Sequence, residues 1–491
     1  MNTIPARFHK IVADAPESTA VIDADFKEYS YGQLSAMADA IRSRFPIEKP
    51  RRVGVLTGHG VEQVASILAV ICSGGAYVAV EPSLPGERIR RIFEESDVEF
   101  VITGHANSDR LGRFPVMVLP KISEMLSEKA AVSASEVLST TPAYILYTPT
   151  RTGKRKGVVV ENGNVVNYVD AFIKEFGMGR GDVMLQASVC TFDSFVEELF
   201  VSLLSGAALA ILPETNRGDV RSIVHFAEQT GVTVYSTFTP IIADLNSRSR
   251  FPSKMRLIIA NGPILHPSDI SIIKDKCMIY YSYGLSETTV RASWQRCDNY
   301  PMASDVAAYP IGKPIAGVEL AILNENLEPC APMEPGEICV LGEGVARGYV
   351  GADDPSNFTT MPNGQRVYLT GDTGMFDGEV FHYLQGRSRQ VTIEGRQVEY
   401  SEIENALRQD PNVESGVVCS LTDSKGKPYL VAYFTAKIEQ AAVSLAALRR
   451  NMKSRLAWFK VPEFFIQMQA LPRKKNGRIN LKALPHILKE K

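Results

Sequence analysis

Helix-like and strand-like segments alternate along the first 260 residues, and this alternation constrains the fold more than any other feature of the sequence. Residues 52–57 and 76–80 are short apolar runs of the kind that form buried strands, and residues 61–72 between them have helical apolar spacing. Further strand-like runs follow at residues 116–118, 183–186, 208–212, 232–235 and 256–260. Strands separated by helices form largely parallel sheets with helices on their faces, so the sequence predicts an α/β fold.

The pattern changes from about residue 311, where short alternating strands with Gly and Pro turns begin. Residues 318–323 are one example, and such segments predict a β-rich subdomain. A further unit of mixed strand and helix patterns follows, and its length of about 100 residues is typical of a small α+β domain. We therefore expect one domain over residues 1–386 and a second over residues 387–491, with the boundary near Arg387–Arg389.

Composition and charge exclude several classes of protein. Apolar residues make up 45% of the chain and charged residues 22%, which is the balance of a globular protein and not of a disordered or fibrous one. With 53 basic and 55 acidic side chains the net charge is −2, so the chain has no electrostatic footprint for nucleic acid. The seven cysteines are dispersed without a CxxC pair, which is typical of reduced thiols in a cytosolic protein.

No membrane segment is expected from the sequence. The N-terminus lacks the apolar core of a secretory signal, and the longest apolar stretch, residues 199–212, is too short to span a bilayer. A buried helix that runs into a strand accounts better for that stretch. We therefore expect a soluble cytoplasmic protein with no nucleic acid partner and no membrane span.

Residues 147–157, with the sequence YTPTRTGKRKG, form the most informative stretch of the chain. They lie between two apolar segments that predict strands, at residues 143–146 and 158–160. Backbone N–H groups and Thr hydroxyls on such a loop can bond phosphate oxygens, and Lys supplies compensating charge. A basic surface loop accounts for the same residues, so the loop by itself leaves both interpretations open.

The loop resembles the YTSG[ST]TGxPKG phosphate loop of the adenylate-forming superfamily, specifically the amino-acid-activating adenylation domains of nonribosomal peptide synthetases. Seven further motifs resemble those of the family and follow its order over nearly the whole chain. They are KAGxAYVPLD at residues 73–82, FDxS at 192–194, YGPTE at 283–287, GELxIxGxxVARGY at 336–349, YRTGD at 368–372, GR at 386–387 and LPxxxNGK at 471–478. The resemblance implies the superfamily's layered α/β fold with a small, mobile C-terminal lid.

The resemblance implies that ATP activates a carboxylic acid with release of pyrophosphate, and that the acyl group then passes to a phosphopantetheine thiol. Such chemistry depends on positioning and on charge neutralisation around the α-phosphate. Glu287 is then expected to hold Mg²⁺, Lys156 to face the pyrophosphate, and Arg478 to stand at the position of the catalytic lysine. The residues expected to bind ATP are Thr148, Thr152, Gly153, Lys156, Asn261, Gly262, Tyr283, Asp372 and Arg387.

Asp193 indicates which class of substrate the protein activates. In amino-acid-activating members a carboxylate at this position pairs with the substrate α-ammonium group, whereas an N-cap role for the following helix is the alternative. The positions expected to line the substrate pocket are Asp193, Ser194, Glu197, Ser236, Ile259, Asn261, Ser282, Val290 and Arg291. This lining is small and polar, so we expect a small or polar amino acid. Glu197 and Arg291 either pair and reduce the cavity, or one of them binds a polar side chain.

The chain departs from the family motifs at several positions. Pro149, Thr150 and Arg151 replace the Ser-Gly-Ser/Thr of the phosphate loop, which removes a flexible Gly and an N–H donor. Arg478 replaces a lysine and is larger, planar and bidentate. The hinge element at residues 386–395 is one residue shorter than in the family.

These features lead to three hypotheses. The first is a stand-alone amino acid adenylating ligase that uses ATP and Mg²⁺ and, because no carrier segment follows residue 478, delivers its product to a carrier protein in trans. The second is a degenerate, non-catalytic homologue that binds a nucleotide or a partner protein. The third is an acyl- or aryl-CoA ligase, against which Asp193 argues.

Overall fold

The computed structural model describes residues 2–128, 135–149, 155–262, 264–301, 308–324, 326–351, 357–361, 363–386, 390–393, 396–423, 428–437, 443–473 and 479–485. The chain separates into two compact units, of which the first comprises residues 1–370 and 374–382 and the second residues 371–373 and 383–491. The domain boundary expected near Arg387–Arg389 stays a prediction, since those residues lie outside the described ranges.

A large, mostly parallel sheet carries one half of the first unit, and its described strands pair in the order β15-β14-β13-β12-β11-β9-β10-β1-β2. The bounds, in that order, are Lys313–Pro314, Ser293–Arg296, Met278–Tyr283, Leu257–Asn261, Val234–Phe238, Val183–Gln186, Ala208–Ile211, Thr19–Ile22 and Glu28–Ser30. The central pairs from β1 to β13 are parallel, while β2, β14 and β15 are antiparallel edge strands. The carboxyl ends of the parallel strands therefore meet along one edge.

A second sheet in the same unit pairs its described strands in the order β18-β8-β7-β4-β3-β5-β6. The bounds are Gly348–Tyr349, Arg155–Glu161, Pro142–Pro149, Ala76–Ala79, Arg52–Leu56, Phe100–Thr103 and Val116–Val118. Strands β3, β4, β5, β6 and β7 run parallel, and β8 turns back antiparallel to β7. The residues between β7 and β8 belong to the predicted phosphate loop and lie outside the described ranges.

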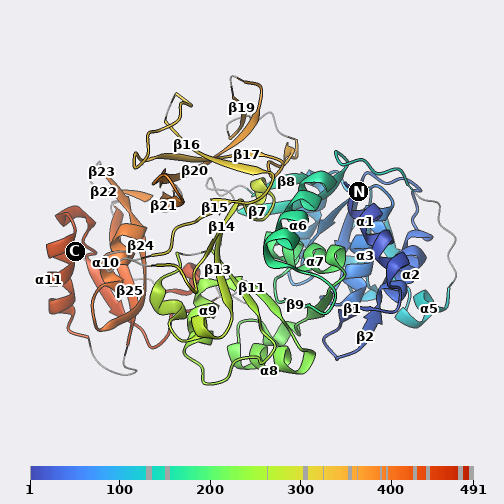
Figure 1. The fold of residues 1–491 in the computed structure, drawn as a ribbon, viewed down its shortest axis with the longest axis horizontal. Coiled ribbons are helices and arrows are strands. Elements are labelled where there is room, and N and C mark those ends of the chain that lie inside the picture. The colour runs from blue at the N-terminus through green and yellow to red at the C-terminus, as the bar shows by residue number, and fades with distance from the viewer. Residues whose placement is uncertain are drawn as a thin grey trace. The chain divides into compact units, whose positions relative to one another are not determined.

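Helices separate the two sheets (Figure 1). Helix α7 packs on β9, β10 and β11, α3 packs on β3 and β4, and α1 contacts both helices. Nearly every residue of α3 and α7 is buried, as expected of helices that have a packed neighbour on all sides. The bounds of this layer are α1 (Ile4–Asp14), α2 (Tyr31–Arg42), α3 (Val61–Cys72), α6 (Asn162–Phe176) and α7 (Asp193–Ser205). The apolar stretch at residues 199–212 is thus a buried helix that leads into β10, as the sequence predicts.

Further helices of this unit are α4 (Gly86–Glu95), α8 (Val220–Thr230), α9 (Thr239–Asn246) and α5 (Ile122–Ser127), and α5 packs on α2. The predicted β-rich subdomain is a further sheet of β16 (Val318–Leu323), β17 (Gly336–Gly342), β20 (Arg366–Phe376), β19 (Phe358–Thr360) and β21 (Phe381–Gly386). Within the described ranges, none of the helices has the length and apolarity that a membrane crossing requires.

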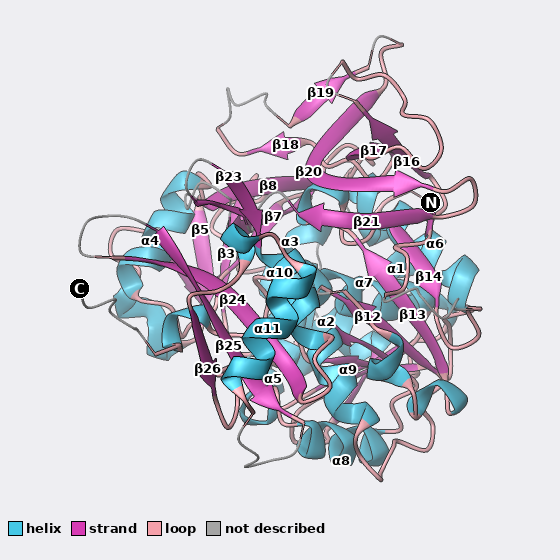
Figure 2. Ribbon diagram, turned by 90° about the vertical axis from the view of Figure 1, so that its left-hand side faces the viewer, coloured by secondary structure: helices cyan, strands magenta, loops and turns pink. Residues whose placement is uncertain are grey.

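The second unit has a sheet of β24 (Val413–Thr422), β25 (Pro428–Ala436) and β26 (Phe464–Gln467). Helices α10 (Tyr400–Arg408) and α11 (Leu445–Arg455) share one apolar core with this sheet, and Figure 2 shows both helices on the same face. A hairpin of β22 (Gln390–Ile393) and β23 (Arg396–Glu399) precedes them. Together with the layered sheets of the first unit, this arrangement confirms the predicted α/β fold with a small α+β unit.

Candidate active site

The order of the strands marks one crevice in the first unit. The chain leaves β9 through α7 to reach β10 on one side, whereas β11, on the other side of β9, continues to β12 and β13. In parallel α/β sheets, ligands bind beyond the carboxyl ends of strands at such a reversal of direction. Most of the residues expected to line the substrate pocket lie on β11, β12 and β13 or in the first two turns of α7, and Val290 and Arg291 lie in the loop between β13 and β14.

The sheet supplies a buried floor of small side chains. Ser236 on β11 is the register neighbour of Ile259 on β12, and the Nδ2 of Asn261 donates to the Oγ of Ser236 at 3.2 Å. The Oγ of Ser282 on β13 donates to the carbonyl of Ala260 at 3.0 Å. All of these side chains are buried, so the structure brings four expected pocket residues together on adjacent strands.

Asp193 is the first residue of α7, and its side chain does not cap that helix, whose N-cap is Phe192. Its Oδ2 accepts a hydrogen bond from the Oγ of Ser286 at 3.0 Å, and its Oδ1 lies 3.9 Å from the Nη1 of Arg291. The side chain of Asp193 is 18% exposed, against 5% for that of Arg291. Asp193 is therefore more exposed than the arginine with which it interacts, and its side chain does not have the N-cap role that was the alternative.

Arg291 is surrounded by partners on α6 and α7. Its Nη2 donates to the Oγ of Ser194 at 2.9 Å, and its Nε lies 3.4 Å from the Oε2 of the fully buried Glu197. The Tyr168 hydroxyl donates to the same Oε2. Burial by itself lowers the pKa of Arg291, but the Glu197 and Asp193 carboxylates outweigh it and the net shift is upward. We call the following five residues the Arg291 cluster: Arg291, Asp193, Ser194, Glu197 and Tyr168.

The contact between Arg291 and Glu197 is an ion pair without an aligned hydrogen bond. The Nε of Arg291 and the Oε1 of Glu197 are buried and have no hydrogen-bond partner among the described residues. Of the two arrangements left open by the sequence, the structure has the ion pair.

The loop that places Arg291 beside Glu197 has a strained backbone. Thr289 and Val290 have φ values of 55° and 75°, which is a costly conformation for β-branched residues. A Cβ on Gly284 would lie 2.3 Å from the carbonyl oxygen of Val290, so only glycine lets the loop fold back at this point. The buried Val290 then packs at the pocket while Arg291 reaches α7.

Tyr349 links two expected residues, Glu287 and Lys156. This carboxylate is only 9% exposed, and its Oε1 accepts a hydrogen bond from the Tyr349 hydroxyl at 2.8 Å. The Nζ of Lys156 lies 4.6 Å from the centre of the Tyr349 ring, which is a cation–π distance. Burial raises the pKa of Glu287 and the charge of Asp193 adds to it, while the bond from Tyr349 opposes the shift.

The surroundings of Glu287 are compatible with Mg²⁺ held mainly by a nucleotide. The described residues contain no group of three or more metal-ligating side chains. Mg²⁺ at nucleotide sites usually takes one or two carboxylates and completes its shell with phosphate oxygens and water, so a single buried carboxylate fits.

The residues expected to bind adenine lie at strand ends. Asn261 ends β12 and Tyr283 ends β13, and both are buried. Gly262 has φ 85°, and a Cβ there would lie 3.0 Å from the Phe238 ring. The expected ribose ligand Asp372 is buried on β20, within residues 371–373 that group with the second unit.

Several expected residues cannot be compared with the geometry. Thr152, Gly153, Arg387 and Arg478 lie outside the described residues, and of Thr148 only its place in β7 is described. Sequence reasoning missed other participants. Tyr168, Ser286 and Tyr349 belong to no expected site, although Ser286 and Tyr349 lie inside the recognised motifs, and that position was the available signal.

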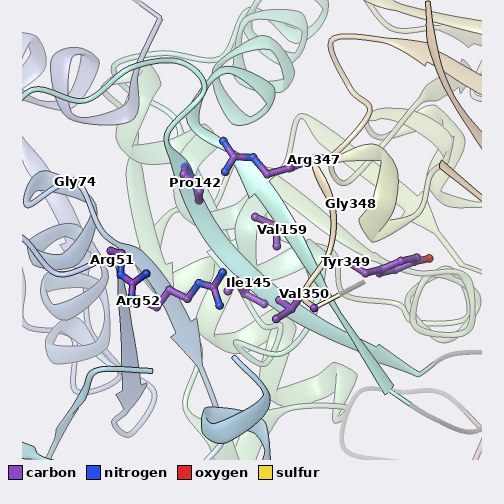
Figure 3. A pocket seen from close by; sticks show the side chains of 11 residues that line it. Arg51, Arg52, Gly74, Pro142, Ile145, Val159, Arg347, Gly348, Tyr349 and Val350 are labelled. Atoms are coloured by element: carbon purple, nitrogen blue, oxygen red, sulfur yellow. The ribbon is translucent and has the colours of Figure 1, made fainter. Parts of the chain in front are cut away.

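A cavity of about 380 Å³ lies elsewhere in the first unit, next to β18. Figure 3 shows Arg52 and Arg347 at its rim and Ile145 and Val159 in its wall. Tyr349 lines it from one side while its ring points away. The expected site residues do not line this cavity.

The model of the AMP-binding enzyme family matches residues 8–350. Bacitracin synthase 1 of Bacillus licheniformis is 30% identical over 96% of the chain, which spans only 9% of that relative's length. Among solved structures, Klebsiella oxytoca NpsA in complex with 3-hydroxyanthranilyl-AMSN has a TM-score of 0.84 at 22% identity, with 98% of each chain covered. The o-succinylbenzoate coenzyme A synthetase of Bacillus subtilis, solved with ATP and magnesium, has a TM-score of 0.81 at 23% identity and covers 97% and 98% of the two chains.

The family match covers well over half of the chain, and the strand-end site agrees with it. The chain belongs to the AMP-binding enzyme family, a group of adenylate-forming ligases. The predicted resemblance to adenylation domains of nonribosomal peptide synthetases is confirmed.

Proposed function

We propose that this protein activates a small or polar α-amino acid with ATP and Mg²⁺ to an aminoacyl adenylate. The observation that carries the proposal is the Asp193 carboxylate, which begins α7 at the strand-order reversal and is the most open acid of the Arg291 cluster. A carboxylate there complements an α-ammonium group, which an aryl or fatty acid lacks.

The residues proposed to line the substrate pocket favour a small or polar side chain. Among them are the buried Glu197–Arg291 ion pair and, on the sheet, the buried Ser236 and Ser282. A long apolar side chain would have to displace a buried ion pair, which is costly.

In the proposed reaction a substrate carboxylate oxygen attacks the α-phosphorus of ATP. The new O–P bond forms as the bond to the bridging oxygen breaks, and pyrophosphate leaves. Lys156 and Arg478 would stabilise the phosphate charge, and Glu287 would hold Mg²⁺, which when bound would supply further positive charge to the phosphate oxygens. The remaining nucleotide contacts are proposed for Thr148, Thr152, Gly153, Asn261, Gly262, Tyr283, Asp372 and Arg387.

The second half-reaction is proposed to use a carrier protein. Its phosphopantetheine sulfur attacks the adenylate carbonyl, the thioester bond forms, and AMP leaves as the carbon–oxygen bond breaks. Residues 387–491 are proposed to act as a lid that turns at residues 387–389 between the two steps.

ATP–pyrophosphate exchange with each amino acid in turn, in the presence of Mg²⁺, tests the proposal. We expect exchange with a small or polar amino acid, and Asp193→Asn should lower kcat/KM for it about 100-fold while the KM for ATP holds, because an amide cannot neutralise an ammonium group. A folded protein that binds ATP but exchanges with no acid would overturn the proposal in favour of a non-catalytic homologue.

A further inference from the structure

A second buried polar group lies at the carboxyl ends of β3, β4, β9 and β10, so it draws on both sheets of the first unit. We call it the Arg217 cluster; it comprises His59, Glu81, Gln186, Cys190 and Arg217. The loop after β9 is tied to the loop after β4, because the backbone N–H and the thiol of Cys190 both lie 3.1 Å from the Oε1 of Glu81.

The charge of Arg217 acts on both His59 and Cys190. It lowers the pKa of His59 after the larger effect of burial, and it partly opposes the rise that burial and Glu81 cause in the pKa of Cys190. The backbone of Gln186 is a hydrogen-bonding neighbour of His59. Residues of the loops after β3, β9 and β10 are therefore near enough for their charges to act on one another.

The guanidinium of Arg217 is buried, and two of its three nitrogens are unused among the described residues. Its side chain is 3% exposed, and its one ion pair in the described part of the chain joins Nη1 to the exposed Glu214 at 3.5 Å. The Nε and Nη2 atoms are buried and find no hydrogen-bond partner among the described residues. These two nitrogens form the planar fork with which arginine binds two oxygens at once.

The loops that carry the Arg217 cluster hold further unused polar atoms. Both polar atoms of the Gln186 side chain are buried and lack a partner within the described ranges, as does the hydroxyl of Thr57, two residues before His59. Burial and the charge of Arg217 lower the pKa of His59 to about 3, against the opposing effect of hydrogen bonding to the Gln186 backbone and the Gln63 side chain, so the ring is neutral. The unused atoms are thus mostly donors around one positive charge.

We propose that Arg217 and Gln186, beside the neutral His59 ring, bind a small oxyanion. Two oxygens of a carboxylate or a phosphate would accept from the Nε and Nη2 of Arg217, and the Gln186 amide would donate to the same group. Gly58 and Thr215, on the loops that carry these residues, are exposed, so the site has a rim at the surface. It shares no residue with the proposed nucleotide site at Lys156 and Glu287.

Calorimetric titration of the full chain tests this site, with inorganic phosphate as one probe and acetate as the other. Lys156→Gln serves as the control for phosphate binding at the nucleotide site, and should keep the response. Arg217→Gln, which loses the fork, should weaken binding at least about tenfold, and Arg217→Lys, which keeps only the charge, should fall between. Binding of one probe but not the other identifies the class of oxyanion.

Two results would overturn the proposal. If neither probe binds to the wild-type protein at about 50 mM, water makes the hydrogen bonds to the Nε and Nη2 of Arg217. Equal binding by the wild type and Arg217→Gln would place the anion elsewhere. Should Arg217→Gln not fold, Gln186→Leu replaces it, because it removes the amide donor while the fork remains, and an unchanged affinity in that variant counts against the site.

Discussion

Two buried arginines at the carboxyl edge of the same sheet have opposite surroundings. Arg291 is flanked by the carboxylates of Glu197 and Asp193 and donates to Ser194, so its charge is compensated inside the protein. Among the described residues, Arg217 has one exposed acid partner, Glu214, and its Nε and Nη2 have no hydrogen-bond partner. A buried charge is stable only when it is paired. Carboxylates inside the protein pair the charge of Arg291, whereas the partner that we propose for Arg217 is an anion from solution.

Replacement of the compensated arginine should have the largest effect. We expect Arg291→Met to lower the free energy of unfolding by about 3–5 kcal/mol, because the fully buried Glu197 carboxylate loses its countercharge. Urea unfolding measures this change. The double variant Arg291→Met/Glu197→Gln should regain much of it, and a single-variant loss below about 1 kcal/mol would show that the ion pair is not what balances Glu197.

The region around Arg291 should lose stability toward high pH. Glu198 on α7 is fully buried, and burial raises its pKa from 4.5 to about 8. The folded state favours the protonated acid, so this contribution is complete below pH 4.5 and is lost as the pH rises toward 8, with a slope of at most about 1.4 kcal/mol per pH unit. Glu198→Gln should flatten the slope in urea unfolding; if the slope persists, the carboxylate is ionised in the fold.

The region around Arg217 should lose stability in the opposite direction. The pKa of His59 falls from 6.5 to about 3 because of burial and of Arg217, so its contribution is complete above pH 6.5 and is lost as the pH falls toward 3. His59→Gln should flatten this acid-side slope by up to about 1.4 kcal/mol per pH unit. His225→Gln on exposed α8 is the matched control, and equal slopes for both variants would contradict the assignment.

The smallest effect is expected at the uncompensated arginine itself. In a chloride buffer without oxyanions, Arg217→Met should raise the free energy of unfolding by about 1 kcal/mol, because an unpaired charge leaves the interior. In phosphate or acetate the advantage should shrink, since only the wild type binds the anion. A loss of about 2 kcal/mol or more in both buffers would show that Arg217 already has an internal partner.

The sequence predicted the elements of the fold closely where the apolar pattern is simple. Residues 52–57, 61–72 and 76–80 correspond to β3, α3 and β4 within one residue. The strand expected at residues 232–235 is β11, from Val234 to Phe238, because the polar Ser236 and Thr237 are buried in the sheet and interrupt the apolar run. The pairing of β11 with its neighbouring strands buries Ser236 and Thr237, and this pairing cannot be predicted from the local apolar pattern.

The candidate site was predictable only in part. Motif matches pointed to Asp193 and Glu287, and the structure surrounds both with partners that no motif names, such as Ser286 and Tyr349. Arg217 belongs to no recognised motif. It is a candidate because its Nε and Nη2 have no hydrogen-bond partner among the described residues, and this can be known only from the positions of all neighbouring atoms.

The sequence by itself determined the family, the alternation of helices and strands, and the acids available to the site, because motifs and apolar periodicity are local properties of the chain. The tertiary structure decided which charges meet. Ser194 and Arg291 are 97 residues apart and form a hydrogen bond only because Gly284 lets a strained loop fold back onto α7. Pairing of charges depends on distances of a few ångströms, and these distances are set by packing.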